Sequence, residues 1–137
     1  MLRSKPRKTR VKKVQALLGF NMSNEIKKIK TIVNRKDFLL AAKGKRSAQP
    51  GFLLQARDRG DDTSITRTGF TCSKKIGNSV TRNKAKRRLR EISRSVLTRL
   101  GKSGWDYVLI GRPKATTKRP FSLLEEDLEI AVKNIHS

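Results

Sequence analysis

The sequence is short of the side chains on which most enzymes and metal proteins depend. It has one cysteine, Cys72, and one histidine, His136, in 137 residues. A structural zinc site needs about four ligands of these types, so the composition argues against one. A Ser-His-Asp or Cys-His mechanism would have to use a histidine beside the last residue, which is a poor anchor for a catalytic group. A single cysteine cannot form an intrachain disulfide, which suits a reducing compartment.

Acidic residues are also scarce. The chain has 11 Asp and Glu against 34 Lys and Arg, and its formal net charge is +23. Carboxylates could in principle form a two-metal nuclease site, but their densest cluster, residues 125–129, begins a predicted helix, where acids complement the helix dipole. No apolar run approaches the roughly 20 residues of a membrane helix. We therefore expect no catalytic residue and no metal site in the protein, and no membrane contact. A nucleic acid is the first expectation for a partner.

The basic residues are concentrated in one run, residues 73–91, which contains no acid before Glu91. Its cationic members are Lys74, Lys75, Arg82, Lys84, Lys86, Arg87, Arg88 and Arg90. Like charges at this density repel one another unless a polyanion neutralises them. A basic pair leads into a Gly-Asn turn and then an amphipathic helix, which indicates a folded surface for phosphates rather than a basic tail. The simpler alternative is a solvated helix face.

The chain divides into two parts of different composition. Residues 1–24 carry many basic residues and no acid, which predicts a disordered N-terminal extension. This extension would be an auxiliary RNA contact; the alternatives are that translation starts at Met22 or that the segment is a transit peptide. Residues 25–137 are predicted to form a single RNA-binding domain, since their length suits one modest core.

The pattern of apolar residues predicts an α+β fold. The expected elements are a helix over 35–43, strands over 52–57 and 65–73, a helix over 81–100, a strand over 105–112 and a last helix that includes Leu124 and Ile135. The order is helix–strand–strand–helix–strand–helix, with room for a further strand within 52–73. Segments 44–51 and 113–120 are predicted loops. The simplest architecture is one sheet with helices against one face.

The basic run and its surroundings resemble the protein subunit of bacterial ribonuclease P. That family carries a basic strand-turn-helix signature centred on an Arg-Asn-Arg run, and here Arg82-Asn83-Lys84 is followed by Lys86-Arg87-Arg88-Leu89-Arg90. Matching segments also lie upstream and downstream. They are Arg35-Lys36-Asp37-Phe38, Arg67-Thr68-Gly69-Phe70-Thr71 and Asp106-Tyr107-Val108-Leu109-Ile110. The resemblance covers about residues 28–135.

The resemblance implies a fold and a function. The fold is an α-β sandwich of the ribosomal protein S5 domain 2-like type. The protein is a non-catalytic subunit that assists a catalytic RNA in removing the 5′ leader from precursor tRNA by hydrolysis of a phosphodiester. The implied partners are that RNA subunit and the leader, with no protein partner required, in the bacterial cytoplasm. No cofactor binds the protein alone, and the Mg²⁺ of the holoenzyme is bound mainly by RNA.

The resemblance also implies two binding surfaces. The RNA subunit would be bound by Lys74, Lys75, Asn78, Arg82, Asn83, Lys84, Lys86, Arg87, Arg88 and Arg90. A cleft for the leader would be lined by Phe38, Leu53, Gln55, Lys86 and Arg90. The chain departs from the family pattern at Ala42, where a second aromatic residue is usual, and at Lys84, which keeps the charge of the second Arg but lacks its bidentate fork.

Simpler interpretations of these residues remain open. Phe38 is a typical core residue of a short helix, Asn83 could bridge a local turn, and the Gly77-Asn78 pair is first a backbone requirement. Two other classes of function also fit the charge. One is an RNA-binding module such as a ribosomal protein or an RNA chaperone. The other is a nuclease that cleaves without an RNA subunit.

Overall fold

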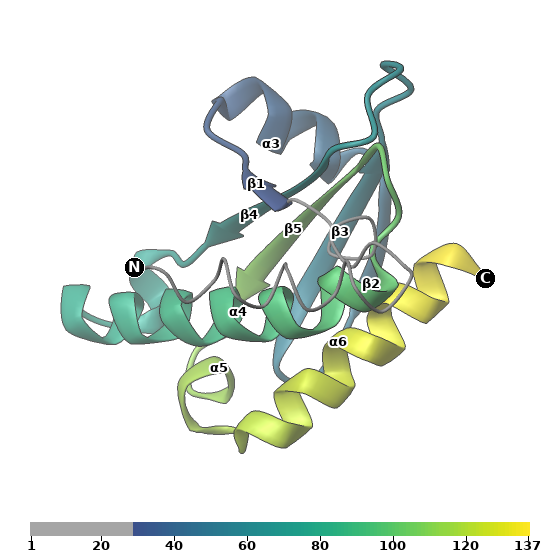
Figure 1. Cartoon of the computed structure of the whole chain (residues 1–137). Helices are drawn as coiled ribbons and strands as arrows, with labels where there is room; N and C mark the ends of the chain where they lie inside the picture. The colour runs from purple at the N-terminus through teal and green to yellow at the C-terminus, as the bar shows by residue number, and fades with distance from the viewer. Residues whose placement is uncertain (1–28) are drawn as a thin grey trace, which may run out of the picture.

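The computed structural model describes residues 29–137, so the predicted extension of residues 1–24 lies outside the described part (Figure 1). The described elements are, in chain order, β1 (Ile29–Thr31), α3 (Arg35–Ala42), β2 (Lys45–Ala48), β3 (Phe52–Asp58), β4 (Thr66–Thr71), the 3₁₀ turn η1 (Lys74–Ile76), α4 (Ser79–Leu100), β5 (Trp105–Gly111), α5 (Ala115–Lys118) and α6 (Phe121–His136). The fold is a mixed α+β fold, as predicted.

The strands form one five-stranded sheet in the order β1-β4-β5-β3-β2. β4 pairs in parallel with both β1 and β5, whereas β3 pairs antiparallel with both β5 and β2. β5 is the central strand, which the nearly continuous apolar run Tyr107–Ile110 predicted, because a strand covered on both faces needs apolar side chains on both.

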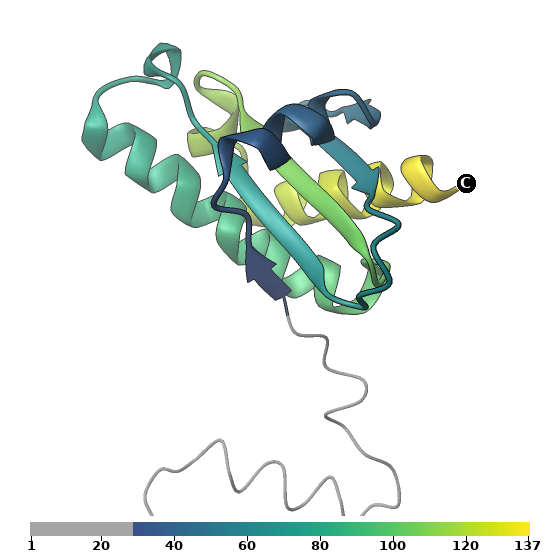
Figure 2. The ribbon, with the colours of Figure 1, turned by 90° about the horizontal axis from the view of Figure 1, so that it is seen from above.

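Helices cover both faces of this sheet, and the expectation that they cover one face is wrong. In β5, Tyr107 and Leu109 belong to the core under α4 and α6, while Val108 belongs to a smaller cluster with Ala41 of α3. Figure 2 shows α3 in front of β4 and β5, with α4 and α6 behind the sheet. Four consecutive residues of β5, Asp106 to Leu109, are buried, which requires a cover on each face of the sheet. The weak amphipathicity of α3 did not show which face it covers. Within residues 29–137, no helix is long and apolar enough to cross a membrane.

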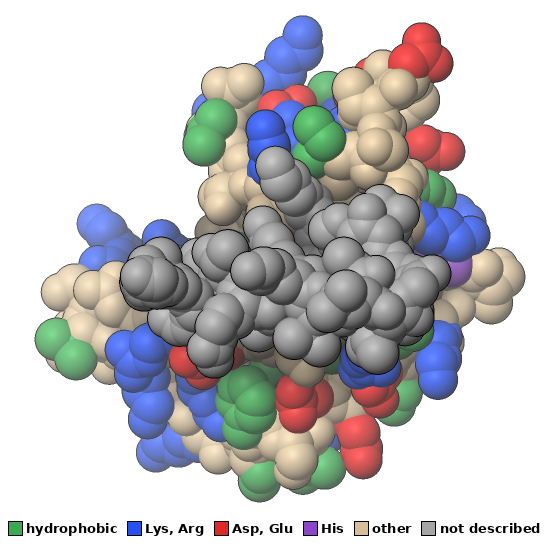
Figure 3. Space-filling model, viewed as in Figure 1, with side chains coloured by type: hydrophobic (Ala, Val, Ile, Leu, Met, Phe, Trp, Pro, Cys, Tyr) green, Lys and Arg blue, Asp and Glu red, His purple; other side chains and the backbone are tan. Residues whose placement is uncertain are grey.

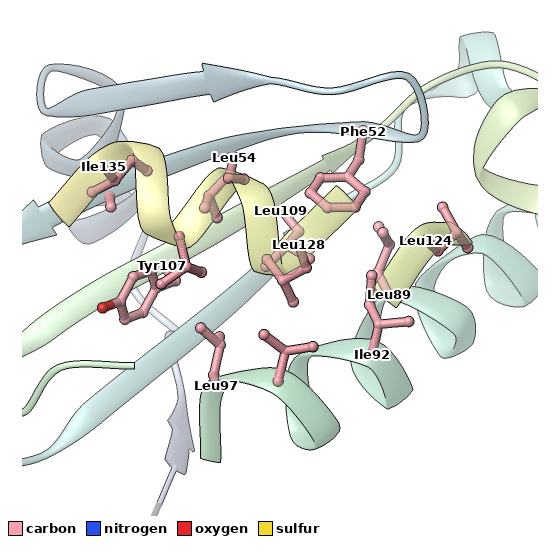
Figure 4. Close-up of a cluster of buried hydrophobic side chains, with 14 residues drawn as sticks. Phe52, Leu54, Leu89, Ile92, Leu97, Tyr107, Leu109, Leu124, Leu128 and Ile135 are labelled. Atoms are coloured by element: carbon pink, nitrogen blue, oxygen red, sulfur yellow. The ribbon is translucent and has the colours of Figure 1, made fainter. Parts of the chain in front are cut away.

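The main core lies between the sheet and the α4–α6 pair (Figure 4). The predicted amphipathic character of α4 is confirmed: Ala85, Leu89, Ile92 and Val96 are all fully buried, and Leu100 at its end is partly buried. Their spacing of three and four residues places them on one side of the helix, and the opposite side is free for charged residues. The core therefore fixes which side of α4 faces solvent.

Two predicted loops contain short elements. β2 occupies Lys45–Ala48 within the expected loop 44–51, and α5 occupies Ala115–Lys118 within the expected loop 113–120. β2 is an edge strand with one buried residue, so it shows no apolar alternation, and its pairing with β3 defines it. Residues 52–73 hold β3 and β4 and no third strand.

Candidate nucleic-acid interface

The turn before α4 is built from local hydrogen bonds. Gly77 has a φ of 146°, which L side chains rarely adopt. The Asn78 side-chain oxygen accepts a hydrogen bond of 2.9 Å from the backbone N–H of Thr81 and caps the helix. In η1, the Ser73 hydroxyl accepts one from the N–H of Lys75. The Gly-Asn pair is thus a backbone requirement, and it fixes the basic pair of η1 against the start of α4.

The side of α4 that faces away from the core is strongly basic. The exposed members of the basic run are Lys74, Lys75, Lys84, Arg87 and Arg90, whereas Arg82 and Lys86 are half-buried. No acidic residue within 29–137 lies within ion-pair distance of any of these. Figure 3 shows Lys and Arg side chains gathered at the left of the view, around the N-terminal half of α4. We call this set, together with Asn78, Asn83 and Arg88, the α4 surface; its positive charge has no neutralising partner in the described chain, which suits binding to phosphates.

Arg88 differs from the rest of the α4 surface. Its guanidinium donates hydrogen bonds of 2.8 Å to the carbonyl of Thr116 and 2.6 Å to the carbonyl of Arg119. The Thr116 hydroxyl in turn donates to the carbonyl of Gly51 at 2.6 Å. Arg88 therefore ties α4 to the short α5 segment. Binding of Arg88 to the RNA subunit stays a prediction, because its guanidinium also holds the α5 segment through these two hydrogen bonds.

Three predicted leader residues lie on the opposite face of the sheet, under or beside α3. Leu53 pairs with Ile110 and Gln55 with Val108, so both point to the face that α3 covers. The ring of Phe38 lies on Gly69, where an added Cβ would come 2.6 Å from Phe38 Cε1. We call this region the α3 face. The structure brings these three residues together.

An open hollow of about 440 Å³ borders Phe38 on the α3 face. It is also lined by Val33, Arg35, Leu39 and Thr71. Val33 is 81% exposed and Leu39 is 52% exposed, which is unusual for large apolar side chains near a small cluster. Sequence reasoning missed these four residues. A usable signal was Val33, an apolar residue just before the first helix and outside its buried stripe.

Lys86 and Arg90 do not line that hollow. Arg90 Cζ lies 5.8 Å from the centroid of the Phe70 ring, and Phe70 packs against the main core on the α4 side. Lys86 acts electrostatically on Cys72, which also packs there. The structure places these two residues on the α4 side of the sheet and Phe38 on the α3 side, so their joint part in one leader cleft stays a prediction.

The two buried acids among the described residues serve structural purposes. The fully buried Asp106 accepts hydrogen bonds from Arg59 and Arg67. Asp127 accepts from the backbone N–H of Gly51 and from Arg119. Residues 29–137 contain no group of three His, Cys, Asp or Glu that could hold a metal ion. These carboxylates are already paired with cations, so they do not fit a protein-borne magnesium site.

The remaining candidate for a catalytic group, His136, packs at the end of the core. Its Nε2 lies 2.7 Å from the Tyr107 hydroxyl, and its ring meets Trp105 edge-on at 4.5 Å between centroids. The same burial raises the pKa of Tyr107 to about 12, so this phenol stays protonated at neutral pH. The histidine thus closes the end of the core, as expected for a residue with a structural role.

Comparison with known proteins agrees with this geometry. The family model for ribonuclease P matches residues 26–136. The ribonuclease P protein component of Ruegeria pomeroyi is 51% identical over 111 residues, which is 80% of this chain and 88% of that protein. The ribonuclease P protein of Staphylococcus aureus has a similar structure, with a TM-score of 0.64, 28% identity and coverage of 78% of this chain and 95% of that one. The ribonuclease P protein of Thermotoga maritima has a TM-score of 0.60 and 32% identity, with coverage of 72% of this chain and 91% of that one. This chain therefore belongs to the ribonuclease P protein family, whose members take part in tRNA processing.

Proposed function

We propose that this chain is the non-catalytic protein subunit of ribonuclease P, which binds the catalytic RNA through the α4 surface and the 5′ leader of precursor tRNA on the α3 face. The observation that carries the proposal is the α4 surface itself: a row of cations without acidic partners among the described residues, held by a helix whose other side is fully buried. A fixed array of this kind binds a polyanion without having to order itself first.

The α4 surface would bind phosphates of the RNA subunit. Arg82 and Arg87 can each present a planar fork to one phosphate, while Lys84 and Lys86 act as point charges. By screening repulsion between RNA strands that must approach each other, these cations would lower the magnesium concentration that the folded RNA needs. Asn78 and Asn83 lie in the same segment; Asn78 already uses its side-chain oxygen as the cap of α4.

The α3 face would hold the single-stranded leader. Proteins that grip single strands combine a positive groove with aromatic platforms on which bases stack. Phe38 is the aromatic platform here, and the open hollow beside it adds the exposed apolar side chains of Val33 and Leu39 and the cation of Arg35. Ala42 is exposed one turn along α3 and supplies no second ring. The proposed leader contact therefore depends on one aromatic residue.

The chemistry would belong to the RNA. The two buried carboxylates, Asp106 and Asp127, are paired with arginines, so the proposal assigns the magnesium ions mainly to RNA ligands and gives the protein no cofactor of its own. The residues of this chain then act by binding and orienting RNA. We further propose that the holoenzyme acts in the bacterial cytoplasm and needs no other protein.

Reconstitution tests the proposal. Purified protein is mixed with a bacterial ribonuclease P RNA at low magnesium, and cleavage of a precursor tRNA is followed beside samples with protein alone and RNA alone. The proposal expects cleavage only when both are present, and tighter holoenzyme binding of a precursor with a leader than of mature tRNA. Cleavage by the RNA-free protein would identify a self-sufficient nuclease. Binding without stimulation would identify a general RNA-binding module.

A further inference from the structure

α3 is a weak support for a binding platform. It has eight residues, and the side chain of its N-cap residue Asn34 makes no capping hydrogen bond. A helix this short is marginal without tertiary contacts. Its buried contacts are few: Ala41 is buried, and Phe38 is partly buried in a small cluster with Val108 and Ile110. The position of α3 over the sheet therefore needs additional contacts.

A chain of charged side chains provides them. The fully buried Asp106 of β5 binds Arg67 of β4 through two hydrogen bonds, Nε to Oδ1 at 2.8 Å and Nη2 to Oδ2 at 2.7 Å. The remaining nitrogen of Arg67, Nη1, donates to Oδ2 of Asp37 on α3 at 3.3 Å. The Asp37 side chain is 18% exposed and that of Arg67 is 24% exposed, so solvent screens this contact only in part. The network joins the centre of the sheet to the first turn of α3.

This network sits directly beside the proposed leader platform. Arg67 and Gly69 lie two residues apart on β4 and face α3, and their partners on the helix are the consecutive residues Asp37 and Phe38. The ion pair therefore fixes the helix at the residue next to the aromatic ring. Arg57 also approaches Asp37, at 3.9 Å, from β3.

We propose that Asp37 and Arg67 are positioning residues that hold Phe38 in the orientation that binds the leader. This inference rests on the proposed function of the α3 face. An acidic residue beside a binding site for RNA weakens binding by simple repulsion, so charge alone gives Asp37 no favourable role there. The contact with Arg67 gives Asp37 a favourable role, because Arg67 is itself fixed in a bidentate pair with the buried carboxylate of Asp106.

The test measures the affinity of the reconstituted holoenzyme for precursor tRNA and for mature tRNA. For Asp37→Asn, we expect the ratio of the two affinities to fall by at least about threefold, because the helix that carries Phe38 loses its fixed position. Removing a negative charge by itself would strengthen RNA binding. The two explanations thus predict opposite signs. Asp62→Asn is the matched control, since it removes the same charge at an exposed position with a φ of 65°, which Asn tolerates, and it should leave the ratio unchanged.

Two further variants keep the test decisive. Arg67→Lys preserves the charge and removes the fork, so it should also lower the ratio even if Asp37→Asn folds poorly. In a Phe38→Ala background, Asp37→Asn should cause no further loss in the ratio, whereas a general loss of stability would act in both backgrounds. If the wild type discriminates by leader but neither variant changes the ratio, the inference is overturned and the proposed function stands. If the wild type itself does not discriminate, the proposed leader site is wrong.

Discussion

The α4 surface and the α3 face differ in how firmly the fold holds them. α4 is a 22-residue helix with a side-chain cap at Asn78 and a stripe of fully buried residues in the main core. α3 has eight residues, no side-chain cap and a small apolar cluster, and a charged network supplies its most specific contacts. Local stability in a protein varies with the density of such contacts. We expect α3 to open locally at a lower free energy than α4.

The difference matches the two proposed tasks. A surface for a structured RNA gains from a rigid array of cations, because no ordering cost is added on binding. A site for a single-stranded leader needs an aromatic ring held where a base can stack on it, and such stacking tolerates any base. The same sheet thus carries two proposed binding surfaces that the fold holds by different means, a large apolar core under α4 and the charged contact of Asp37 with Arg67 under α3.

The largest effect should come from breaking the core under α4. Leu89 is fully buried between α4 and the sheet, so Leu89→Ala should lower the free energy of unfolding by about 2–5 kcal/mol. Urea denaturation followed by circular dichroism measures this change. Leu39→Ala on α3 is the matched control, and because that side chain is 52% exposed it should change the value by no more than about 0.5 kcal/mol. Equal losses at the two positions would contradict the contrast between the helices.

The next effect concerns the α3 face alone. Phe38→Ala should weaken holoenzyme binding of precursor tRNA by about 1–3 kcal/mol, the worth of one stacked base. Mature tRNA should bind almost as before. Thermal unfolding is the control, because Phe38 also packs on Gly69 and in the small cluster with Val108. A large fall in melting temperature with equal losses for both RNAs would favour a purely structural role for Phe38.

A smaller effect is expected from single cations of the α4 surface. Arg82→Ala should reduce the slope of log affinity against log salt for the RNA subunit by roughly 0.7–0.9, the loss of one phosphate contact. Filter binding over a salt series measures it. Arg99→Ala is the control on the same helix, because Arg99 is exposed and paired with Glu129, 2.7 Å away. An unchanged slope for Arg82→Ala would place its guanidinium outside the interface.

The sequence predicted the α4 side of the molecule better than the α3 side. The periodic apolar stripe of α4 predicts both the helix and the side that it buries, and the basic run predicts the side that faces solvent. β2 and α5 were missed, since pairing with β3 and hydrogen bonds from Arg88 define them rather than any local pattern. The sequence grouped Arg90 with Phe38, whereas the structure places them on opposite faces of the sheet. A list of basic and aromatic residues does not say which face of a sheet each helix covers.

The bridge that Arg67 makes between Asp106 and Asp37 was equally hidden. Its three residues lie on β5, β4 and α3, and each is an ordinary charged residue in the sequence. Their approach depends on the strand order, which places β4 beside β5, and on the register that pairs Arg67 with Asp106. Tertiary pairing of this kind leaves no periodic signal along the chain.

The smallest expected effect is a change in the alkylation rate of a cysteine thiol, which can be measured on each of the two surfaces at neighbouring positions. Cys72 packs on the α4 side next to Lys86, while Thr71 lines the hollow of the α3 face. Burial raises the pKa of the Cys72 thiol and the charge of Lys86 lowers it, so neutralising Lys86 should raise this pKa further. Lys86→Gln should therefore slow alkylation of Cys72 by iodoacetamide at pH 8, because less thiolate is present. Bound RNA subunit should slow it too, through its phosphates and by covering the site.

A second thiol completes this comparison. In a Cys72→Ser background, Thr71→Cys places the only cysteine on the α3 face, one residue away. Addition of a precursor tRNA to the holoenzyme should then slow alkylation of this thiol, whereas mature tRNA should not, because only the leader would reach the hollow. The RNA subunit alone should protect Cys72 in the wild type and leave the thiol at position 71 reactive. Protection of both thiols by the RNA subunit alone would mean that one RNA surface covers both faces at this end of the sheet, and the division of tasks between α4 and α3 would not hold there.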